Sequence, residues 1–231
     1  MMGQDERMVC RNDLFRIYGL LNGHFGDLHW WPAEEPFEVM VGAILTQNTA
    51  WANVEKAIAA LKGNRLLSPE ALFRVDEGTL AGIIRPSGYY NVKAGRLKSF
   101  VRFLQEEYAG DIGIMSAEEL PALRDKLLGV QGIGQETADS ILLYACGKPV
   151  FVCDAYTRRI LQRHRMIDDE ADYRSIQEMF MDHLPHDAAL FNQFHALIVY
   201  AGKTFCRKVP KCDPCPLRTL HAERARLPRR E

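Results

Sequence analysis

Residues 127–145, LLGVQGIGQETADSILLYA, decide the fold because they place Gly132 and Gly134 between two helix-like segments. One helix is expected to end near Gly129 and the next to begin near Gln135. Glycine reaches backbone angles that are closed to other residues, so the chain can turn sharply between the two helices. The pattern predicts a helix-hairpin-helix motif, and the alternative is a plain sharp turn between two helices.

The hairpin would also suit a particular ligand. Backbone amides in the turn and at the start of the second helix carry partial positive charge, and a phosphate oxygen is their natural acceptor. Because the glycines have no side chains, a DNA backbone can approach closely, and such contacts carry no sequence information. We therefore expect four residues to bind DNA: Gly132, Gly134, Gln135 and Thr137.

The remaining sequence also indicates helices. Six segments place apolar residues three and four positions apart, namely residues 36–49, 51–63, 68–85, 91–110, 116–130 and 136–147. Ser68 and Ser116 are expected to open helices, the latter within a capping box. No segment alternates strictly between apolar and polar residues, and the β-rich piece 149–153 fits an extended connector. The fold class is therefore all-α.

Charge and composition limit the functions to consider. The 231 residues carry a net charge of −1, but the segment from residue 203 onward has nine Lys and Arg against three acidic residues, a local charge of +6. A phosphate backbone would attract this tail, although a solvated basic tail is the alternative. No secretory signal or run of about 18 apolar residues is visible, so a cytoplasmic protein without a membrane segment is expected.

The hairpin and the stretch that follows it together resemble a known family. Asp154 lies twenty residues after Gly134 in residues 147–159, GKPVFVCDAYTRR. This arrangement resembles the endonuclease III superfamily of DNA base-excision glycosylases, defined by a helix-hairpin-helix and a Gly/Pro-rich loop with an essential aspartate. Residues 36–49 and 85–97 are similar to further parts of that family. WWP at residues 30–32, LTQNT at 45–49, RPSGYYN at 85–91 and the Glu of GIGQETADSIL together look most like the 3-methyladenine DNA glycosylase branch.

The resemblance implies two α-helical domains. Residues 36–148 would form a barrel of about six helices that includes the hairpin. Residues 1–35 and 149–231 would form a second domain with the catalytic aspartate and a Cys-rich loop. Double-stranded DNA containing a damaged base would be the partner of a monomeric enzyme, associated with the nucleoid, and the flipped nucleotide would lie between the domains.

Asp154 is the expected catalytic residue. Cleavage of an N-glycosidic bond builds positive charge on the deoxyribose, which a nearby carboxylate stabilises while it orients or deprotonates water. Asp is also a preferred helix N-cap, so a purely structural role is the alternative. Glu136 stands where strand-cleaving relatives carry a lysine that attacks C1′ to give a Schiff base. Since a carboxylate cannot form an imine, the resemblance implies hydrolysis without AP lyase activity.

Flat apolar side chains are expected to surround the extruded base. Three tryptophans and a proline are the candidates: Trp30, Trp31, Trp51 and Pro32. Because tryptophan faces attract cations, an alkylated purine such as 3-methyladenine is the expected substrate, whereas ordinary core packing is the alternative. Gln47, in LTQNT, resembles the family residue that fills the space left by the nucleotide, and Lys203 is a further candidate DNA contact. Oxidised pyrimidines, mismatched uracil or thymine, and non-catalytic binding of distorted DNA remain alternative functions.

The C-terminal cysteines indicate a metal centre. Cys206, Cys212 and Cys215 are closely spaced, and His221 stands where the family has a fourth cysteine. Three thiolates and one imidazole could hold a [4Fe–4S] cluster, the first choice from the resemblance. The same four side chains could bind tetrahedral zinc, and a loop without metal is the third alternative.

Overall fold

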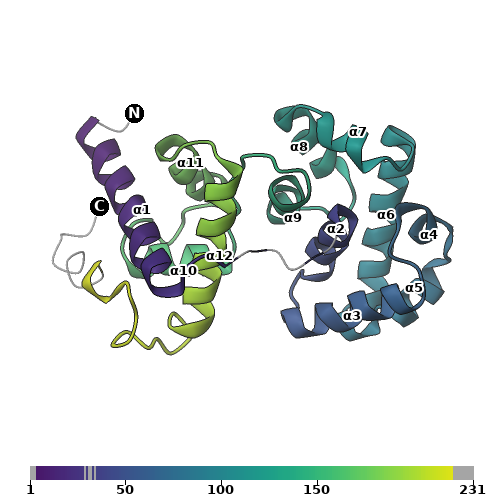
Figure 1. Cartoon of the computed structure of the whole chain (residues 1–231), viewed down its shortest axis with the longest axis horizontal. Helices are drawn as coiled ribbons and strands as arrows, with labels where there is room; N and C mark the ends of the chain where they lie inside the picture. Colours follow the sequence, from purple (N-terminus) through teal and green to yellow (C-terminus); the bar gives the residue numbers. More distant parts are fainter. Residues whose placement is uncertain (1–3, 29, 31–32, 34, 221–231) are drawn as a thin grey trace. The chain divides into compact units, whose positions relative to one another are not determined.

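The part of the chain that the computed structural model describes, residues 4–28, 30, 33 and 35–220, consists of helices and connecting loops with no β-strand. It divides into two units (Figure 1), Trp31–Lys148 on the one hand and Met1–Trp30 with Pro149–Glu231 on the other. The all-α class predicted from the sequence is confirmed.

The unit Trp31–Lys148, here called the hairpin unit, is built around α2 and α6. Its elements are α2 (Pro36–Leu45), α3 (Trp51–Gly63), α4 (Pro69–Arg74), α5 (Glu77–Ile83), η1 (Arg85–Ser87), α6 (Tyr90–Tyr108), α7 (Ile112–Ala117), α8 (Leu120–Gly129), α9 (Gln135–Ser140) and the π-helical η2 (Ile141–Ala145). α6 packs against α4 and α5 (Figure 1). α2 packs against η2. α2 is buried from Phe37 to Leu45 and forms the centre of the unit. Each fully buried Leu or Ile contributes about 1.5–3 kcal/mol.

Local capping decides where these helices begin. Ser68 caps α4 as predicted, but the segment 68–85 is broken because Asp76 accepts a hydrogen bond from Thr79 N at 2.9 Å and starts α5. The predicted helix opening at Ser116 is wrong. Ser116 lies inside α7, which Asp111 caps by accepting from Gly113 N at 2.7 Å, whereas α8 starts later, at Leu120.

The second unit, here called the aspartate unit, contains α1 (Gln4–Phe25), α10 (Ala155–Arg163), α11 (Tyr173–His183) and α12 (Ala188–Thr204). α12 packs against both α1 and α10 (Figure 1). The rings of Phe151 and Phe180 stack in its core, with centroids 3.7 Å apart and an interplanar angle of 5°. The extended connector at residues 149–153 is therefore as predicted, and it contributes directly to this core.

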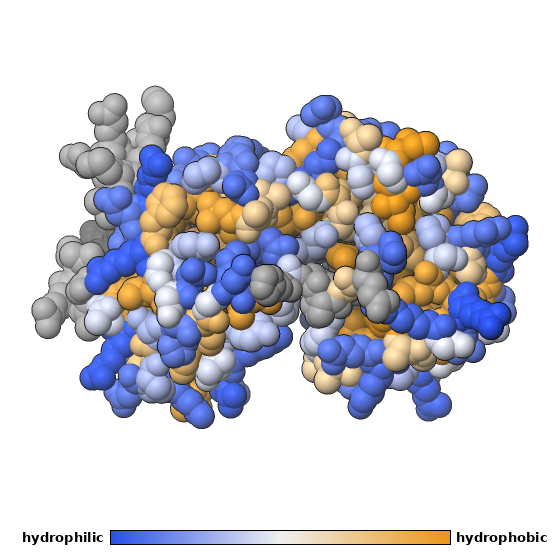
Figure 2. Space-filling model, in the orientation of Figure 1, coloured by the Kyte–Doolittle hydropathy of each residue, from blue (hydrophilic) through white to orange (hydrophobic). Residues whose placement is uncertain are grey.

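The surface mixes polar and apolar side chains. Figure 2 shows hydrophilic residues interspersed with smaller apolar areas on the visible face of each unit. Of the helices within the described ranges, none has the length and apolar character that crossing a membrane requires.

Candidate functional site

The predicted hairpin is present between α8 and α9. Gly132 has a φ of +87°, and a Cβ atom there would lie 2.3 Å from Arg96 Cγ, so both the backbone and the packing require glycine. Gly134 is different. It is the N-cap of α9 with a φ of −94°, and a Cβ there would meet no atom within 4 Å. The second glycine therefore leaves space in front of the helix start without being required by the backbone.

A partly buried ion pair joins the two helices of the hairpin. Arg124 of α8 donates to both carboxylate oxygens of Asp139 in α9, at 2.7 and 3.0 Å, and Asp139 is fully buried. Bidentate pairing fixes orientation as well as distance. Sequence reasoning missed this pair. An acidic residue in the apolar segment 136–147 was the available signal, because a buried carboxylate needs a partner.

Gln47 lies on the hairpin. Its Nε2 donates to Gly132 O at 3.1 Å and to Thr137 Oγ1 at 2.8 Å, and its Oε1 accepts from Arg96 Nη1. The Thr137 side chain is thus buried against Gln47, whereas Gln135 and Glu136 are exposed in the first turn of α9. The structure thus brings Gln47 together with two of the predicted hairpin residues, Gly132 and Thr137, although 85 and 90 residues separate them in the sequence.

Trp51 lines a shallow cavity of about 200 Å³ in the hairpin unit, together with Glu38, Gly42 and Ile58. It is the first residue of α3, and its indole Nε1 donates to Glu55 Oε1 at 2.9 Å. The Trp51 ring is therefore oriented by its own helix.

Tyr89 is the most exposed aromatic residue of this unit among those described, at 74%. It follows η1 with a left-handed φ of +46°, unusual for a residue other than glycine. Thr49, two residues after Gln47, donates to Ser87 O at 2.6 Å and so links the Gln47 loop to this turn.

Asp154 begins α10 in the aspartate unit. Its Oδ1 accepts from Thr157 N at 2.8 Å and Thr157 Oγ1 at 3.0 Å, and its Oδ2 lies 3.7 Å from His195 Nε2. At that distance the histidine makes an electrostatic contact rather than a hydrogen bond. Burial acts to raise the pKa of Asp154, but His195 and Thr157 outweigh it, so the pKa lies below its ordinary value. The carboxylate is thus held ionised in a largely buried position.

Trp30 and Lys203 lie together in the same unit. Lys203 Nζ is 5.6 Å from the centroid of the Trp30 ring, within cation–π range, and Tyr200 contacts this ring edge-on. The two residues were predicted separately, as a base-pocket wall and a DNA contact. Trp31 and Pro32, also predicted for the base pocket, lie outside the described residues.

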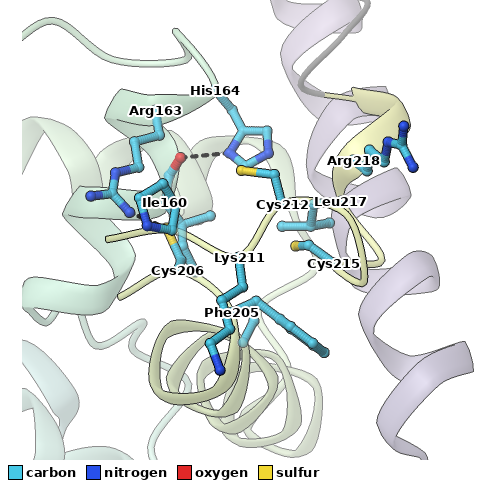
Figure 3. Close-up of a pocket in the computed structure, with 12 residues that line it drawn as sticks. Ile160, Arg163, His164, Phe205, Cys206, Lys211, Cys212, Cys215, Leu217 and Arg218 are labelled. Atoms are coloured by element: carbon cyan, nitrogen blue, oxygen red, sulfur yellow. Dashed lines mark hydrogen bonds between the residues drawn. The ribbon is translucent and has the colours of Figure 1, made fainter. Parts of the chain in front are cut away.

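The three C-terminal cysteines line one cavity of about 200 Å³ (Figure 3), together with Arg163 and His164. Arg163 Nη1 donates to Cys206 Sγ at 3.2 Å, and burial raises the pKa of the Cys215 thiol. Within the described ranges, no three His, Cys, Asp or Glu side chains stand close enough to chelate a single ion. The expected fourth ligand, His221, is outside those ranges.

His164 is a pocket residue that sequence reasoning missed. It is buried, and Figure 3 shows its ring among the side chains of this cysteine cavity. Its Nδ1 lies 2.8 Å from Ile160 O, an arrangement that favours the tautomer with the proton on Nδ1. In that tautomer Nε2 carries the lone pair. A histidine at the end of an amphipathic helix gave no signal by itself.

A helix-hairpin-helix with a glycine-dependent turn and a capped, ionised aspartate after a buried connector define a class of base-excision DNA repair protein. Residues 41–186 match the model of the HhH-GPD superfamily of base excision DNA repair proteins. The chain belongs to that superfamily, as the resemblance to endonuclease III and its relatives predicted.

Three relatives illustrate the range of the superfamily. A Methanocaldococcus jannaschii protein provisionally named as a DNA repair glycosylase is 46% identical over 206 residues, 89% of this chain and 94% of its own length. The 3-methyladenine DNA glycosylase of H. pylori, solved with 1,N6-ethenoadenine, is 29% identical with a TM-score of 0.71, covering 84% of this chain and 97% of its own. A trapped endonuclease III–DNA covalent intermediate has the same fold, with a TM-score of 0.76 at 22% identity, covering 98% of this chain and 100% of its own.

Proposed function

We propose that this base-excision repair protein is a monofunctional DNA glycosylase that hydrolyses the N-glycosidic bond of a damaged base, with Asp154 as its catalytic residue. The observation that carries the proposal is the ionised carboxylate at the start of α10, held between Thr157 and His195. A fixed negative charge stabilises the oxocarbenium-like sugar as the base leaves, without reorganisation at the moment of reaction. The same carboxylate can then orient a water molecule toward C1′.

The hairpin is proposed to hold the DNA strand. The open space in front of Gly134 would let a phosphate reach the backbone amides of the turn, and Gln135 would flank it. Thr137 stays a proposed DNA-binding residue, although its hydroxyl accepts a hydrogen bond from Gln47. Lys203 in the aspartate unit remains a proposed phosphate contact through its ammonium group.

Strand cleavage through an imine is not part of the proposal. The exposed Glu136 in the first turn of α9 occupies the position at which the lyase branch carries its lysine, and a carboxylate cannot attack C1′ to form a Schiff base. Product would therefore be free base and an intact strand with an abasic site.

An alkylated purine such as 3-methyladenine is the proposed substrate. The 3-methyladenine DNA glycosylase of H. pylori supports this substrate, because it is 29% identical to this chain and covers 84% of it. Trp30, Trp31, Pro32 and Trp51 are the proposed walls of the base pocket.

One observation favours a second substrate class. Lys203 already places a cation over the Trp30 ring, which repels a positively charged base on that face and favours an uncharged lesion such as an oxidised pyrimidine or mismatched uracil. The two substrate classes are distinguished by comparing the rates of base release from otherwise identical duplexes that carry either an alkylated purine or an uncharged lesion.

The cysteine cavity is proposed to hold a metal group. Cys206, Cys212 and Cys215 provide three soft donors that line one cavity, and the similarity to endonuclease III favours a [4Fe–4S] cluster over zinc. His221 is the proposed fourth ligand. A bound cluster would supply rigidity to the basic C-terminal segment, and the hydrolysis itself uses the carboxylate and water.

The central experiment measures base release and strand nicking on duplexes carrying single lesions. Asp154→Asn should abolish base release while duplex affinity and folding persist, because Asn also caps helices. Asp172→Asn is a matched control, since Asp172 caps α11 in the same unit by accepting from Ser175 N at 2.8 Å. Turnover of Asp154→Asn at the level of this control would remove Asp154 from the mechanism, and duplex binding without base release by the wild type would indicate a non-catalytic binder.

A further inference from the structure

Lys93 is a buried lysine with an unusual set of partners. It is 1% exposed, and its ammonium donates to Leu45 O at 2.7 Å, Thr49 Oγ1 at 2.6 Å and Ser87 O at 2.8 Å. An ammonium group has three donors, so all are used, and all three acceptors are neutral oxygens. Lys93 thereby connects α6 with the end of α2, the loop after α2 and η1.

The loop that Lys93 holds carries Gln47. All hydrogen-bonding groups of the Gln47 side chain are directed to α6 or the hairpin: Oε1 accepts from Arg96, and Nε2 donates to Gly132 O and Thr137 Oγ1. Arg96 follows Lys93 by three residues, one turn along α6. Its aliphatic part covers Gly132 so closely that no Cβ would fit there. One turn of α6 thus contacts both the Gln47 loop and the hairpin.

These contacts do not fit the expectation that Gln47 fills the space left by the flipped nucleotide. To fill the space left by a flipped nucleotide, its amide would have to give up three hydrogen bonds that are already made. A residue whose contacts are complete before DNA arrives is better suited to keep the hairpin in one conformation, so that the hairpin loses less freedom on binding.

We propose that Lys93 and Arg96 are positioning residues that hold Gln47 against the hairpin, and that Gln47 serves DNA binding as a brace of the hairpin. Lys93 fixes the loop, Arg96 fixes the Gln47 side chain, and Gln47 fixes Gly132 and Thr137. The effect on DNA binding rests on the proposed function, whereas the effect on the hairpin is a property of the free protein.

The first test measures amide hydrogen exchange without DNA. Lys93→Met keeps the length of the side chain and removes its donors, and Gln47→Leu removes the brace alone. Both should accelerate exchange of the amides in residues 131–138 by about tenfold, because local opening becomes easier.

Lys98→Met is the matched control. Lys98 lies on the same helix and also donates to three oxygens, Leu72 O at 3.0 Å, Phe73 O at 2.6 Å and Val75 O at 2.7 Å, but these end α4 and do not touch the hairpin. It should leave residues 131–138 unchanged. Wild-type exchange there in Gln47→Leu, or equal acceleration in both lysine variants, would overturn the proposal. If Lys93→Met does not fold, the amide exchange of residues 131–138 in Gln47→Leu and Arg96→Met decides whether the brace exists.

The second test uses damaged and undamaged duplexes. Gln47→Leu should raise the Kd for undamaged duplex several-fold, a larger factor than any change in its single-turnover rate of base release at saturating enzyme. A lower rate at unchanged Kd would instead place Gln47 at the flipped nucleotide and contradict the brace. If the wild type releases no base, the proposed function fails, and the exchange result in the free protein still decides the brace.

Discussion

His195 Nε2 lies 3.7 Å from Asp154 Oδ2, while Thr157 donates both of its hydrogen bonds to the other carboxylate oxygen. The pairing is set by the packing of α12 against α10, and both side chains are almost completely buried. A carboxylate in such a position would otherwise take up a proton, since burial disfavours its charge. His195 therefore helps to determine the protonation state of the proposed catalytic group.

His195→Phe should move the acid limb of base release to higher pH. Phe suits the neighbouring Phe151, whose ring meets that of His195 edge-on at 6.4 Å, so the fold should persist. Because the pKa of Asp154 is lowered in the folded protein, the wild type stays ionised and active below the ordinary value of 3.8, to the extent that it remains folded. Without His195, burial raises that pKa. Single-turnover rates of base release, measured across pH, locate the acid limb. An acid limb at the same pH in His195→Phe and the wild type would contradict the role of His195 in keeping Asp154 ionised.

The lowered pKa of Asp154 should also affect the stability of the fold at acid pH. The contacts of Asp154 stabilise the fold above the unfolded pKa of 3.8, and this contribution is lost as pH falls through the folded pKa. The acid-unfolding midpoint of His195→Phe should therefore lie at higher pH than that of the wild type.

Gly132→Ala and Gly134→Ala should separate stability from DNA binding. Alanine at residue 132 must take a left-handed backbone and displace Arg96, so the free energy of unfolding should fall by about 1–3 kcal/mol. Alanine at residue 134 meets no atom within 4 Å at a φ of −94°, so stability should stay within about 1 kcal/mol. Its methyl group should nevertheless weaken duplex binding. Denaturant unfolding and DNA titration test both, and unchanged affinity in Gly134→Ala would argue against phosphate contact at this turn.

Lys93 should impose a pH-dependent cost on the fold. Burial, with the nearby Arg96 charge, lowers the pKa of Lys93 from 10.5 to about 8. Between these values the unfolded chain binds more protons than the folded one, so the contribution of Lys93 to the free energy of unfolding should rise with pH from about 8 to 10.5. The difference in unfolding free energy between wild type and Lys93→Met isolates this effect from other titrating groups. A difference that is constant over that range would contradict it.

Glu136→Lys should give the chain some ability to form a Schiff base. The position is exposed in the first turn of α9, so the longer side chain meets no packing cost there. Borohydride reduction in the presence of damaged duplex should trap a covalent adduct with this variant and none with the wild type. Glu136→Gln is the control for loss of the acidic charge. A trapped adduct with the wild type would show that another amine acts as nucleophile.

Local sequence signals were enough for the elements of the hairpin. The spacing of apolar residues and the two glycines place α8, the turn and α9, and Ser68 caps a helix where expected. The opening at Ser116 was mispredicted because Asp111, five residues earlier, caps α7, so Ser116 falls inside that helix and cannot begin one. When two capping residues lie close together, a single sequence does not show which of them begins the helix.

Contacts between distant segments were not visible in the sequence. Gln47 and Thr137 are 90 residues apart, and Lys93 is 48 residues from its acceptor Leu45. Each of these residues alone has an ordinary local explanation. The helix-cap position of Asp154 was foreseeable because Asp is a preferred N-cap, whereas its catalytic role stays a proposal. His195, in contrast, lies in the middle of an apolar helix, where histidine has no distinctive pattern.

The cysteine cavity leads to a prediction about metal content. Protein purified without oxygen should be brown and contain iron and acid-labile sulfide, because three thiol side chains surround one cavity of about 200 Å³. Cys215→Ser should lose iron, whereas Cys153→Ser should retain it, since Cys153 is buried in the connector before α10 and does not line this cavity. His221→Ala and His164→Ala then identify the fourth ligand by which of them lowers the iron content. One equivalent of zinc without iron would favour a tetrahedral site instead, and wild-type iron content in Cys215→Ser would show that the cluster, if bound, is held elsewhere.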